Sequence, residues 1–462
     1  MEQKFLIFSE FGELLDLSME LERKNVMQFV VADHGYKKIG ENIVTFATHW
    51  WLRMGQNFTW IFDGCSNGKL QDWLRAQGEN VFGGCEAGDK LENDRQLNQK
   101  WFKSLGYKIS PSKNFTEFDS AITFVQANAG KLFIMKQNGD APKGLNHKGK
   151  FKDGSDMVFH LTEMKKKWNE AEYGKVDFDL MEIVEGMEVA ASAFFNGHDW
   201  MRDKTGKVVG FLNFEEKKEI NGNLGETTGE MGTLFYGCTE DNELFRRIIL
   251  RPGVADYLRE IGFRGVFDIN SIRLNDGTII PLEPTCRPGI PSTSYEFIEA
   301  LVDPAGTLAA VAAGFDAPVE IVPGFGMVMV IAAKPYPVEA DIEQEASSMG
   351  EKLWILNQDK SQKEFSNSQR NHIHLENFCR DEEGNYRVAT KNGYLLTVTS
   401  SGLSSISGTR KHLIDYIKEN IYISGMKYRT DIGQRCEDYE DLIKQESTEN
   451  IFTAAPLFVK AP

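Results

Sequence analysis

Residues 265–289 read GVFDINSIRLNDGTIIPLEPTCRPG, and this stretch decides the fold expected for the chain. It contains two runs of mostly β-branched and apolar residues, which are typical of β-strands. Between them lies Asn275-Asp276-Gly277, a tripeptide suited to a tight reversal that needs a positive φ angle. The stretch therefore predicts a β-hairpin.

One face of this hairpin is predicted to be polar, because side chains alternate along a strand. Glu283, Thr285 and Arg287 share a face of the second strand, and Asp268 and Asn270 share a face of the first. Oxygen ligands suit Mg²⁺ bound together with substrate phosphates, and a guanidinium holds a phosphate or a carboxylate in bidentate fashion. The pattern indicates a site for a metal ion and a phosphate, although a hairpin with one solvated polar face would show the same residues.

Length and composition indicate a globular protein of two to four domains, since the chain has 462 residues, 41% of them hydrophobic and 26% charged. No run approaches the roughly 18 apolar residues of a membrane helix. The first residues include acids too early for a secretory signal. We therefore expect a cytoplasmic protein with no membrane partner.

The formal net charge of −16 argues against nucleic acid as a partner, because the phosphate backbone repels a strongly acidic protein. An anionic nucleotide would need a local basic pocket. The six cysteines are scattered without CxxC spacing. This fits reduced thiols used in packing better than a disulfide framework or a zinc site.

The first 110 residues alternate between segments typical of strands and of helices. A small parallel αβ sheet is the economical interpretation, with strands over 4–9, 26–32, 59–62 and 80–82 and a helix over 69–78. Ligands bind such sheets at the carboxyl ends of the strands. The loop after the first strand, SEFGE (9–13), has one glycine and two acids, which makes it a poor phosphate cradle.

From residue 111 to about 325 the sequence changes to short strands and glycine-containing turns. Lys136 ends an apolar strand, and NHKGKFKDG (146–154) is typical of a flexible loop, so both are candidates for contacts with nucleotide phosphates. Glu188 is a candidate for binding ribose hydroxyls. Solvated lysines and an ordinary strand acid would explain each of these features alone.

Residues 213–232 combine Lys217-Lys218 with glycines and two adjacent threonines, and such a loop can bind an anion through backbone N–H groups, hydroxyls and positive charge. Beyond it, a helix is expected over 242–262 with a break at Pro252, and another over 293–303.

After residue 325 the sequence becomes rich in strands again. A separate α+β domain is expected, with strands over 325–337, 352–356, 372–378 and 386–401 and a helix over 409–420. Residues 358–370 are polar enough to be a surface loop or disordered. The sequence thus predicts an N-terminal small parallel αβ domain (1–110), a central domain (111–325) and a C-terminal α+β domain (326–462).

Taken in order, several segments resemble the phosphoribosylamine–glycine ligase family, which are ATP-grasp enzymes of purine biosynthesis. The matching segments are GGCEAGDKLENDR (83–95), LMEIVEGMEVAASAFFNG (180–197), EEKKEINGNLGETTGEMG (215–232) and PLEPTCRPG (281–289). The most specific are NGYLLTVTSSG (392–402) and GMKYRTDIGQR (425–435).

This resemblance implies an ATP-grasp fold, in which the nucleotide lies between two antiparallel sheets. It implies ATP and Mg²⁺ or Mn²⁺ as cofactors, and a ligase that forms an amide through an acyl phosphate. The small-molecule partners would be an amino acid such as glycine and an amine acceptor, and the protein would be a monomer or a homodimer. Phosphoryl transfer of this kind depends mostly on positioning and on cations.

The resemblance also assigns residues to roles. The metal ligands would be Glu283, Asp268 and Thr285, and the catalytic cations would be Arg287, Lys217 and Lys218. Nucleotide contacts would come from Arg95, Lys136, Lys217, the adenine hinge with Glu182, Ile183 and Val184, and Glu188 on the ribose. The acyl phosphate and the acceptor would be held by Thr227, Thr228, Gly229, Glu230, Arg287 and Gly289.

Departures from the family pattern leave the acceptor open. Arg95 replaces a lysine and Thr285 replaces an asparagine metal ligand, for which Asp268 would compensate. The N-terminal GSGGREHA loop is SEFGELL here, so a sugar phosphate would meet Glu10 and Glu13 and like charge would weaken its binding. The alternatives are a ligase that uses a different amine and a nucleotide-binding module without ligase activity. A carboxylase-type ATP-grasp enzyme using bicarbonate is disfavoured by the C-terminal segments.

Overall fold

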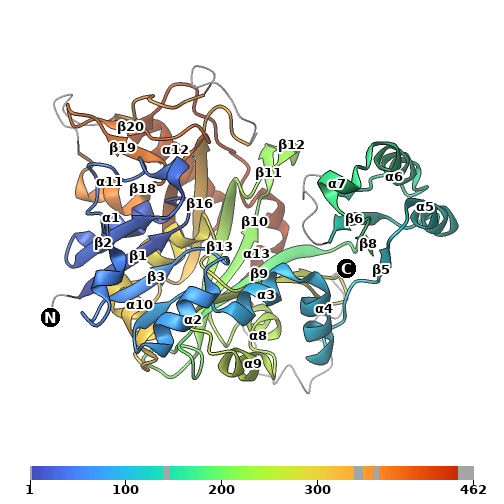
Figure 1. Cartoon of the computed structure of the whole chain (residues 1–462), viewed down its shortest axis with the longest axis horizontal. Coiled ribbons are helices and arrows are strands. Elements are labelled where there is room, and N and C mark those ends of the chain that lie inside the picture. Colours follow the sequence, from blue (N-terminus) through green and yellow to red (C-terminus); the bar gives the residue numbers. More distant parts are fainter. Residues whose placement is uncertain (1–2, 139–145, 338–346, 357–363, 446–462) are drawn as a thin grey trace. The chain divides into compact units, whose positions relative to one another are not determined.

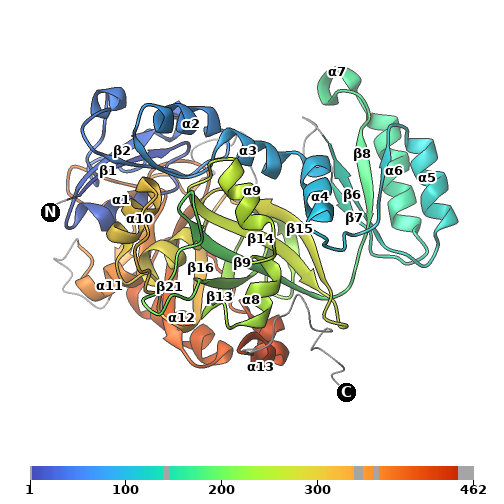
Figure 2. The ribbon, with the colours of Figure 1, turned by 90° about the horizontal axis from the view of Figure 1, so that it is seen from below.

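Figures 1 and 2 show the computed structural model of the chain, which describes residues 3–138, 146–337, 347–356 and 364–445. The described residues form two compact units. The larger unit contains 3–92, 188–270 and 284–445, and the smaller unit contains 93–187 and 271–283. Both units are discontinuous in the sequence, and three consecutive domains with boundaries near 110 and 325 remain a prediction.

The N-terminal residues form the parallel sheet that the sequence predicts, with strand order β2-β1-β3-β4. Its strands are β1 (Lys4–Ser9), β2 (Val26–Val31), β3 (Thr59–Phe62) and β4 (Asn80–Phe82), with helices α1 (Leu15–Glu22) and α2 (Gly68–Ala76). The central strands β1 and β3 are apolar and almost fully buried, as expected where both faces of a parallel sheet are covered. Helix α10 (Pro304–Ala313) packs against β3 and β4.

A large antiparallel sheet carries the strand order β15-β14-β9-β10-β13-β16-β21-β18. Its strands are β9 (Met187–Phe195), β10 (Val209–Glu215), β13 (Gly232–Thr239), β14 (Gly265–Arg273), β15 (Ile279–Thr285), β16 (Gly324–Ala332), β18 (Ile373–Leu375) and β21 (Tyr394–Leu403). Pairing of β13 with β16 carries the sheet without interruption past residue 325. The sheet therefore joins the central and C-terminal parts of the chain.

The smaller unit is built on an antiparallel sheet of order β5-β8-β6-β7. Its elements are β5 (Ser112–Phe115), β6 (Phe133–Gln137), β7 (His147–Lys148), β8 (Phe178–Glu182), α4 (Arg95–Ser104), α5 (Phe118–Ala127), α6 (Ser155–Lys167) and α7 (Glu170–Tyr173). Helix α3 (Glu86–Asn93) belongs to the larger unit except for its last residue. Helices α5 and α6 lie together against one face, where Phe118, Phe133, Leu161 and Phe178 form an apolar core (Figures 1 and 2).

Three expectations for local structure need correction. The segment 146–154 is not wholly a loop, because His147–Lys148 pairs with β6 as strand β7. The helix expected over 293–303 is a π-helix limited to Ser294–Glu299. In 358–370, residues 364–370 are described, and Asn367–His372 forms helix α11 with a capping box between Ser366 and Gln369.

The expected break at Pro252 separates α8 from α9, but the strands expected over 372–378 and 386–401 are each interrupted. The remaining elements are η1 (His34–Tyr36), η2 (Trp50–Arg53), β11 (Lys218–Ile220), β12 (Leu224–Thr227), α8 (Glu243–Ile248), α9 (Val254–Glu260), β17 (Trp354–Ile355), β19 (Phe378–Arg380), β20 (Tyr386–Val388), α12 (Ile406–Asn420), β22 (Ile421–Tyr422), η6 (Gln434–Tyr439) and α13 (Glu440–Ile443). Within the described ranges, no helix has both the length and the hydropathy needed to cross a bilayer.

Candidate active site

The stretch 265–289 forms the predicted hairpin, with β14 and β15 adjacent in the large sheet. The Leu274 N–H donates to the carbonyl oxygen of Thr278 at 2.9 Å, which closes the reversal. Gly277 has φ of 84°, a left-handed conformation that glycine adopts without steric cost. The hairpin prediction is therefore confirmed.

Asp268, on β14, lies within a polar patch of the larger unit. Asn213 Nδ2, on β10, donates to Asp268 Oδ2 at 2.8 Å. Strand β9 runs between β10 and β14 and places Ala190 opposite Asn213, so only a methyl group stands beside this contact. Small residues on β9 thus let longer polar side chains from the two flanking strands meet above it.

Lys217 belongs to the same patch. Its ammonium pairs with Glu215 Oε2 at 2.8 Å, and Asn270 Nδ2 donates to Glu215 Oε1 at 3.4 Å. Lys217 also lowers the pKa of Asp268, although burial and the neighbouring carboxylates dominate that pKa. The cation predicted to contact phosphates and one predicted metal ligand thus act on each other electrostatically.

The patch carries more negative charge than its own cations compensate. Burial, and then Glu215, raise the pKa of Asp268 well above its usual range, while the hydrogen bond from Asn213 opposes the shift. Burial also raises the pKa of Glu296 to about 7. Carboxyl groups perturbed in this way mark a place where a bound cation would be stabilised.

The oxygen atoms of this patch fit a magnesium ion held jointly with phosphates. Asp268 Oδ1 and Asn213 Oδ1 are buried and have no hydrogen-bond partner among the described residues. Mg²⁺ prefers such hard oxygen ligands and usually takes only one or two carboxylates, with the rest from water and substrate phosphates. In the described ranges, no three His, Cys, Asp or Glu side chains are arranged to hold a metal by themselves.

Glu283, the other predicted carboxylate ligand, lies in the smaller unit with Arg95 and Asp179. Burial lowers the pKa of the Arg95 guanidinium, and Glu283 and then Asp179 oppose the shift. Thr285 belongs to the larger unit with Asp268. The predicted metal ligands are therefore distributed over both units, and their joint coordination of one ion remains a prediction.

Lys136 and the adenine hinge lie in the smaller unit. Lys136 on β6 is opposite Asp179 on β8. The N–H groups of Glu182 and Ile183 donate to the carbonyl oxygens of Pro111 and Leu132 at 2.9 and 2.8 Å. These bonds fix the conformation of the chain as it leaves β8 toward Val184, and contacts of Lys136 and the hinge with a nucleotide remain predictions.

The predicted anion-binding loop closes on itself beside Lys217. Thr228 donates to the carbonyl oxygen of Lys217 through its N–H at 2.8 Å and through Oγ1 at 2.9 Å. Lys218 Nζ donates to Thr227 Oγ1 at 2.8 Å. The ammonium of Lys218 is thus held close to a hydroxyl group of the loop.

A cavity of about 1200 Å³ opens in the larger unit at the carboxyl ends of β1 and β3. Arg287 lines it together with Gly229 and Glu230, so the structure brings together three residues predicted to bind substrate. Arg287 Nε pairs with Glu92 Oε1 at 3.1 Å, which fixes the guanidinium. Gly289 lies in the following turn, where its carbonyl oxygen accepts from the Thr293 N–H at 2.9 Å.

Comparisons with known proteins agree with this architecture, although no protein-family model matches the chain. The chain is 26% identical over 379 residues to the phosphoribosylamine–glycine ligase of Synechocystis sp. strain PCC 6803, covering 79% of this chain and 81% of that one. It is 23% identical over 231 residues to the Nostoc sp. strain PCC 7120 ligase of the same name, covering 48% of this chain and only about half (51%) of that relative.

The solved structures include phosphoribosylamine–glycine ligase from Thermotoga maritima, with a TM-score of 0.66 and 18% identity over 93% of this chain and all of that one. The chain is similar in sequence to phosphoribosylamine–glycine ligases and has an ATP-grasp fold. Another structure, the biotin carboxylase domain of Hydrogenobacter thermophilus 2-oxoglutarate carboxylase with MgADP and bicarbonate, has a TM-score of 0.60 and 12% identity over all of both chains. The predicted ATP-grasp fold and family resemblance are confirmed.

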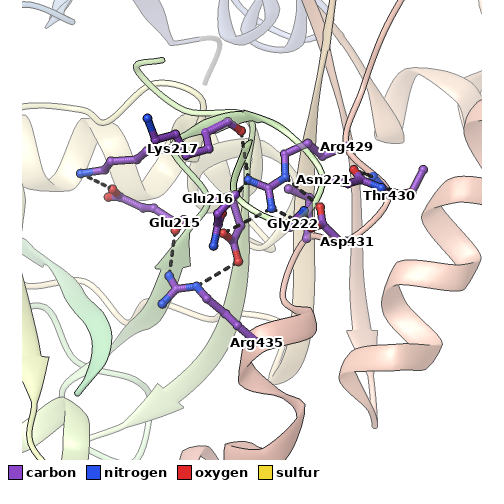
Figure 3. Close-up of polar contacts among 12 residues, drawn as sticks. Glu215, Glu216, Lys217, Asn221, Gly222, Arg429, Thr430, Asp431 and Arg435 are labelled. Carbon is purple, nitrogen blue, oxygen red and sulfur yellow. Dashed lines mark hydrogen bonds and ion pairs between the residues drawn. The ribbon is translucent and has the colours of Figure 1, made fainter. Parts of the chain in front are cut away.

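This ATP-grasp protein uses its GMKYRTDIGQR segment (425–435) in a way that the sequence did not reveal (Figure 3). Arg435 Nε pairs with Glu216 Oε1 at 2.9 Å, and its Nη2 donates to the carbonyl oxygen of Glu215 at 2.8 Å. Arg429, only 1% exposed, pairs with Asp431 through two bonds of 2.8 Å and donates to the carbonyl oxygen of Lys218 at 3.0 Å. The segment therefore braces the anion-binding loop.

Arg435 also interacts electrostatically with Glu188, the residue predicted to bind the ribose. Burial opposes the charge of Arg435, but Cys436, Glu216 and Glu188 raise its pKa above the usual range. Glu188 thus acts electrostatically on the arginine that holds the loop. The sequence segments that carry Glu215-Glu216 and the two arginines match the same family, but neither segment indicates that the acids pair with the arginines.

Proposed function

We propose that this ATP-grasp protein is an ATP-dependent carboxylate–amine ligase. A substrate carboxylate oxygen would attack the γ-phosphorus of ATP and release ADP, giving an acyl phosphate. The nitrogen of an amine would then attack the acyl carbon, the C–O bond to phosphate would break, and the ammonium proton would leave to a base. The products are an amide, ADP and inorganic phosphate.

The position of Glu230 is the observation that carries this proposal. It lines the large cavity, and burial raises its pKa well above the usual range. Among its neighbours Glu215 raises that pKa further and Lys217 lowers it. One residue therefore links the lysine expected to contact phosphates with a cavity able to hold a second substrate, which is what a two-step ligase requires.

The residues of the chain divide between the two half-reactions. Lys217 and Lys218 would orient the phosphates, and Arg287 would hold the acyl phosphate in bidentate fashion. Mg²⁺ bound with ATP would be held by Glu283, Asp268 and Thr285, and it would neutralise charge on the β- and γ-phosphate oxygens.

The names of the curated relatives suggest glycine and phosphoribosylamine as substrates, which would place the reaction in purine biosynthesis. The second candidate is an amino acid joined to a different amine, because Glu10 and Glu13 line the cavity at the carboxyl ends of the parallel strands. A cytoplasmic location and a monomeric or homodimeric state also belong to the proposal. A nucleotide-binding module without ligase activity would not need Arg287, which is retained.

A product assay tests the proposal. Purified protein is incubated with ATP, Mg²⁺, glycine and either freshly generated phosphoribosylamine or a panel of other amines, and ADP and amide products are followed by mass spectrometry. We expect ADP release that depends on both an amino acid and an amine. Arg287→Ala should lower turnover by about 100-fold or more, since a group that stabilises developing charge is lost.

Arg259→Ala provides the matched control, because Arg259 is half exposed and its partners among the described residues, Asp256 and the carbonyl oxygen of His198, lie at the surface of the larger unit. It should keep full turnover. ATP binding with unchanged turnover in Arg287→Ala, or no amine-dependent ADP release with any acceptor, would contradict ligase activity and favour the binding module.

A further inference from the structure

We propose that the cavity of about 1200 Å³ binds a protonated amine that lacks a phosphate group, and that this amine is the acceptor of the ligase. The claim that this amine is the acceptor rests on the proposed function. The claim that the cavity binds an amine is argued from the cavity alone. It departs from phosphoribosylamine, whose phosphate would bring negative charge into the same space.

Carboxylates form the inner wall of the cavity. Asp63, Glu230 and Glu376 are 2%, 6% and 2% exposed, and Glu10 and Glu13 are partly buried beside them. The cavity's lysines have the opposite distribution, because all three are exposed. They are Lys37, Lys38 and Lys391. Arg287 is the inner cation, and its charge is shared with Glu92. A ligand bound deep in the cavity therefore lies near buried acids, while the lysines are solvated at the surface.

Several buried polar atoms of this wall lack a hydrogen-bond partner among the described residues and are therefore available to a ligand. Glu376 Oε2, Thr390 Oγ1 and Tyr394 Oη all belong to cavity-lining residues, and none of them has a hydrogen-bond partner among the described residues. A buried polar atom without a partner costs free energy, so native proteins rarely leave several of them together. A carboxylate oxygen can only accept, and an ammonium group offers three N–H donors.

The carboxyl ends of β1 and β3 add the second argument against a phosphate. Asp63 accepts from the Ser9 hydroxyl and from the Glu10 N–H, the latter at 3.2 Å. Burial, and then Asp63, raise the pKa of Glu13 to about 7, and Arg287 only partly opposes this. A phosphate dianion would add like charge to groups that already disfavour their charged form, whereas an ammonium would relieve them.

The same cavity is also lined by residues expected to contact the acyl phosphate, with which the amine would react. Arg287 and Glu230, which are expected to meet the acyl phosphate and the loop of Lys217, line it together with the acids. An amine anchored by one cationic nitrogen at Glu376 could present a second nitrogen toward Arg287. A diamine is therefore the simplest probe of the site.

Binding without ATP separates this inference from the ligase proposal. Isothermal titration calorimetry and thermal melting would compare 1,4-diaminobutane with ribose 5-phosphate, a stable phosphorylated sugar. We expect the diamine to bind and to raise the melting temperature, and ribose 5-phosphate to do neither. Glu376→Gln and Glu13→Gln should each weaken diamine binding by about 10- to 100-fold, as expected for loss of a charged hydrogen-bond partner.

Glu382→Gln removes an exposed carboxylate on the turn between β19 and β20 of the same unit and should leave diamine binding unchanged. Melting curves of each variant confirm folding, and Glu13→Gln decides if Glu376→Gln does not fold. Binding of ribose 5-phosphate with no binding of the diamine would overturn the inference, as would diamine binding equal in wild type and in a folded Glu13→Gln. Diamine binding without any amine-dependent ADP release would contradict the ligase and leave the amine site standing.

Discussion

Replacement of Arg429 by methionine tests the brace between the anion-binding loop and the C-terminal segment. The guanidinium forms two bonds of 2.8 Å to Asp431, donates to Asn223 Oδ1 at 3.0 Å, and lies 3.6 Å from Glu216. Methionine keeps much of the apolar stem but removes every one of these donors. Asp431 and Glu216 would then lose one of the positive charges and hydrogen-bond donors that stabilise their carboxylates.

The magnitude follows from burial. Loss of one partner of a buried ion pair destabilises a protein by about 3–5 kcal/mol. The lower end applies because Glu216 keeps Arg435 and Asp431 keeps the N–H of Gly222 at 2.7 Å. With an unfolding entropy of about 2.1 cal/mol/K per residue, a loss of about 3 kcal/mol in a unit of roughly 300 residues lowers the melting temperature by about 4–5 °C.

Differential scanning calorimetry measures this shift, and Arg259→Met is the control. Arg259 pairs with Asp256 at the surface, where such pairs contribute about 0–1 kcal/mol, so its loss should shift the melting temperature by less than about 2 °C. The Arg429 variant should also show proteolysis between residues 218 and 227, because the loop loses its anchor. Equal shifts in both variants, or a loop that stays protected, would refute the assignment of Arg429 as a brace.

Three further predictions concern the site and its charges. Glu283→Gln should abolish Mg²⁺-dependent turnover with an unchanged melting curve, and full turnover in this folded variant would remove Glu283 from the metal site. ATP with Mg²⁺ should raise the melting temperature, by the equivalent of about 2.7 kcal/mol at 100 times the Kd, and no shift at millimolar ATP would count against a nucleotide site. Asp16, whose pKa burial raises to about 7, is stabilised as the neutral acid, so its contribution to stability is lost as the pH rises through 7. The stability of Asp16→Asn relative to wild type should therefore rise by about 2.6 kcal/mol between pH 5 and pH 8, measured by urea unfolding, and a difference that does not change with pH would contradict the prediction.

The elements that the sequence predicted best are those whose signals are local. The strands of the parallel sheet are short apolar runs, and the reversal at Gly277 follows from the conformational freedom of glycine. Arg287, Gly229 and Glu230, which the sequence assigns to substrate binding, line one cavity, and their role there remains a prediction. These features need only neighbouring residues or a known pattern.

The features that the sequence missed depend on contacts between distant residues. Nothing near Glu216 announces that Arg435 lies 219 positions away in the chain and within 2.9 Å in space. The helix at Asn367–His372 is a different case, because its Ser366 and Gln369 capping box is a local signal that the polarity of 358–370 obscured. The unpaired atoms at Glu376, Thr390 and Tyr394 could not be foreseen, since burial of a polar atom is a property of the packed chain.

The brace at Arg429 and Arg435 also sets a time order for the maturation of the protein. Ribosomal synthesis proceeds from the N-terminus, so the loop that carries Lys217 emerges more than 200 residues before the arginines that hold it. Until then the loop lacks the contacts that Arg429 and Arg435 supply. A fragment that ends before residue 425 lacks both arginines, so its loop should be less ordered than in the whole chain.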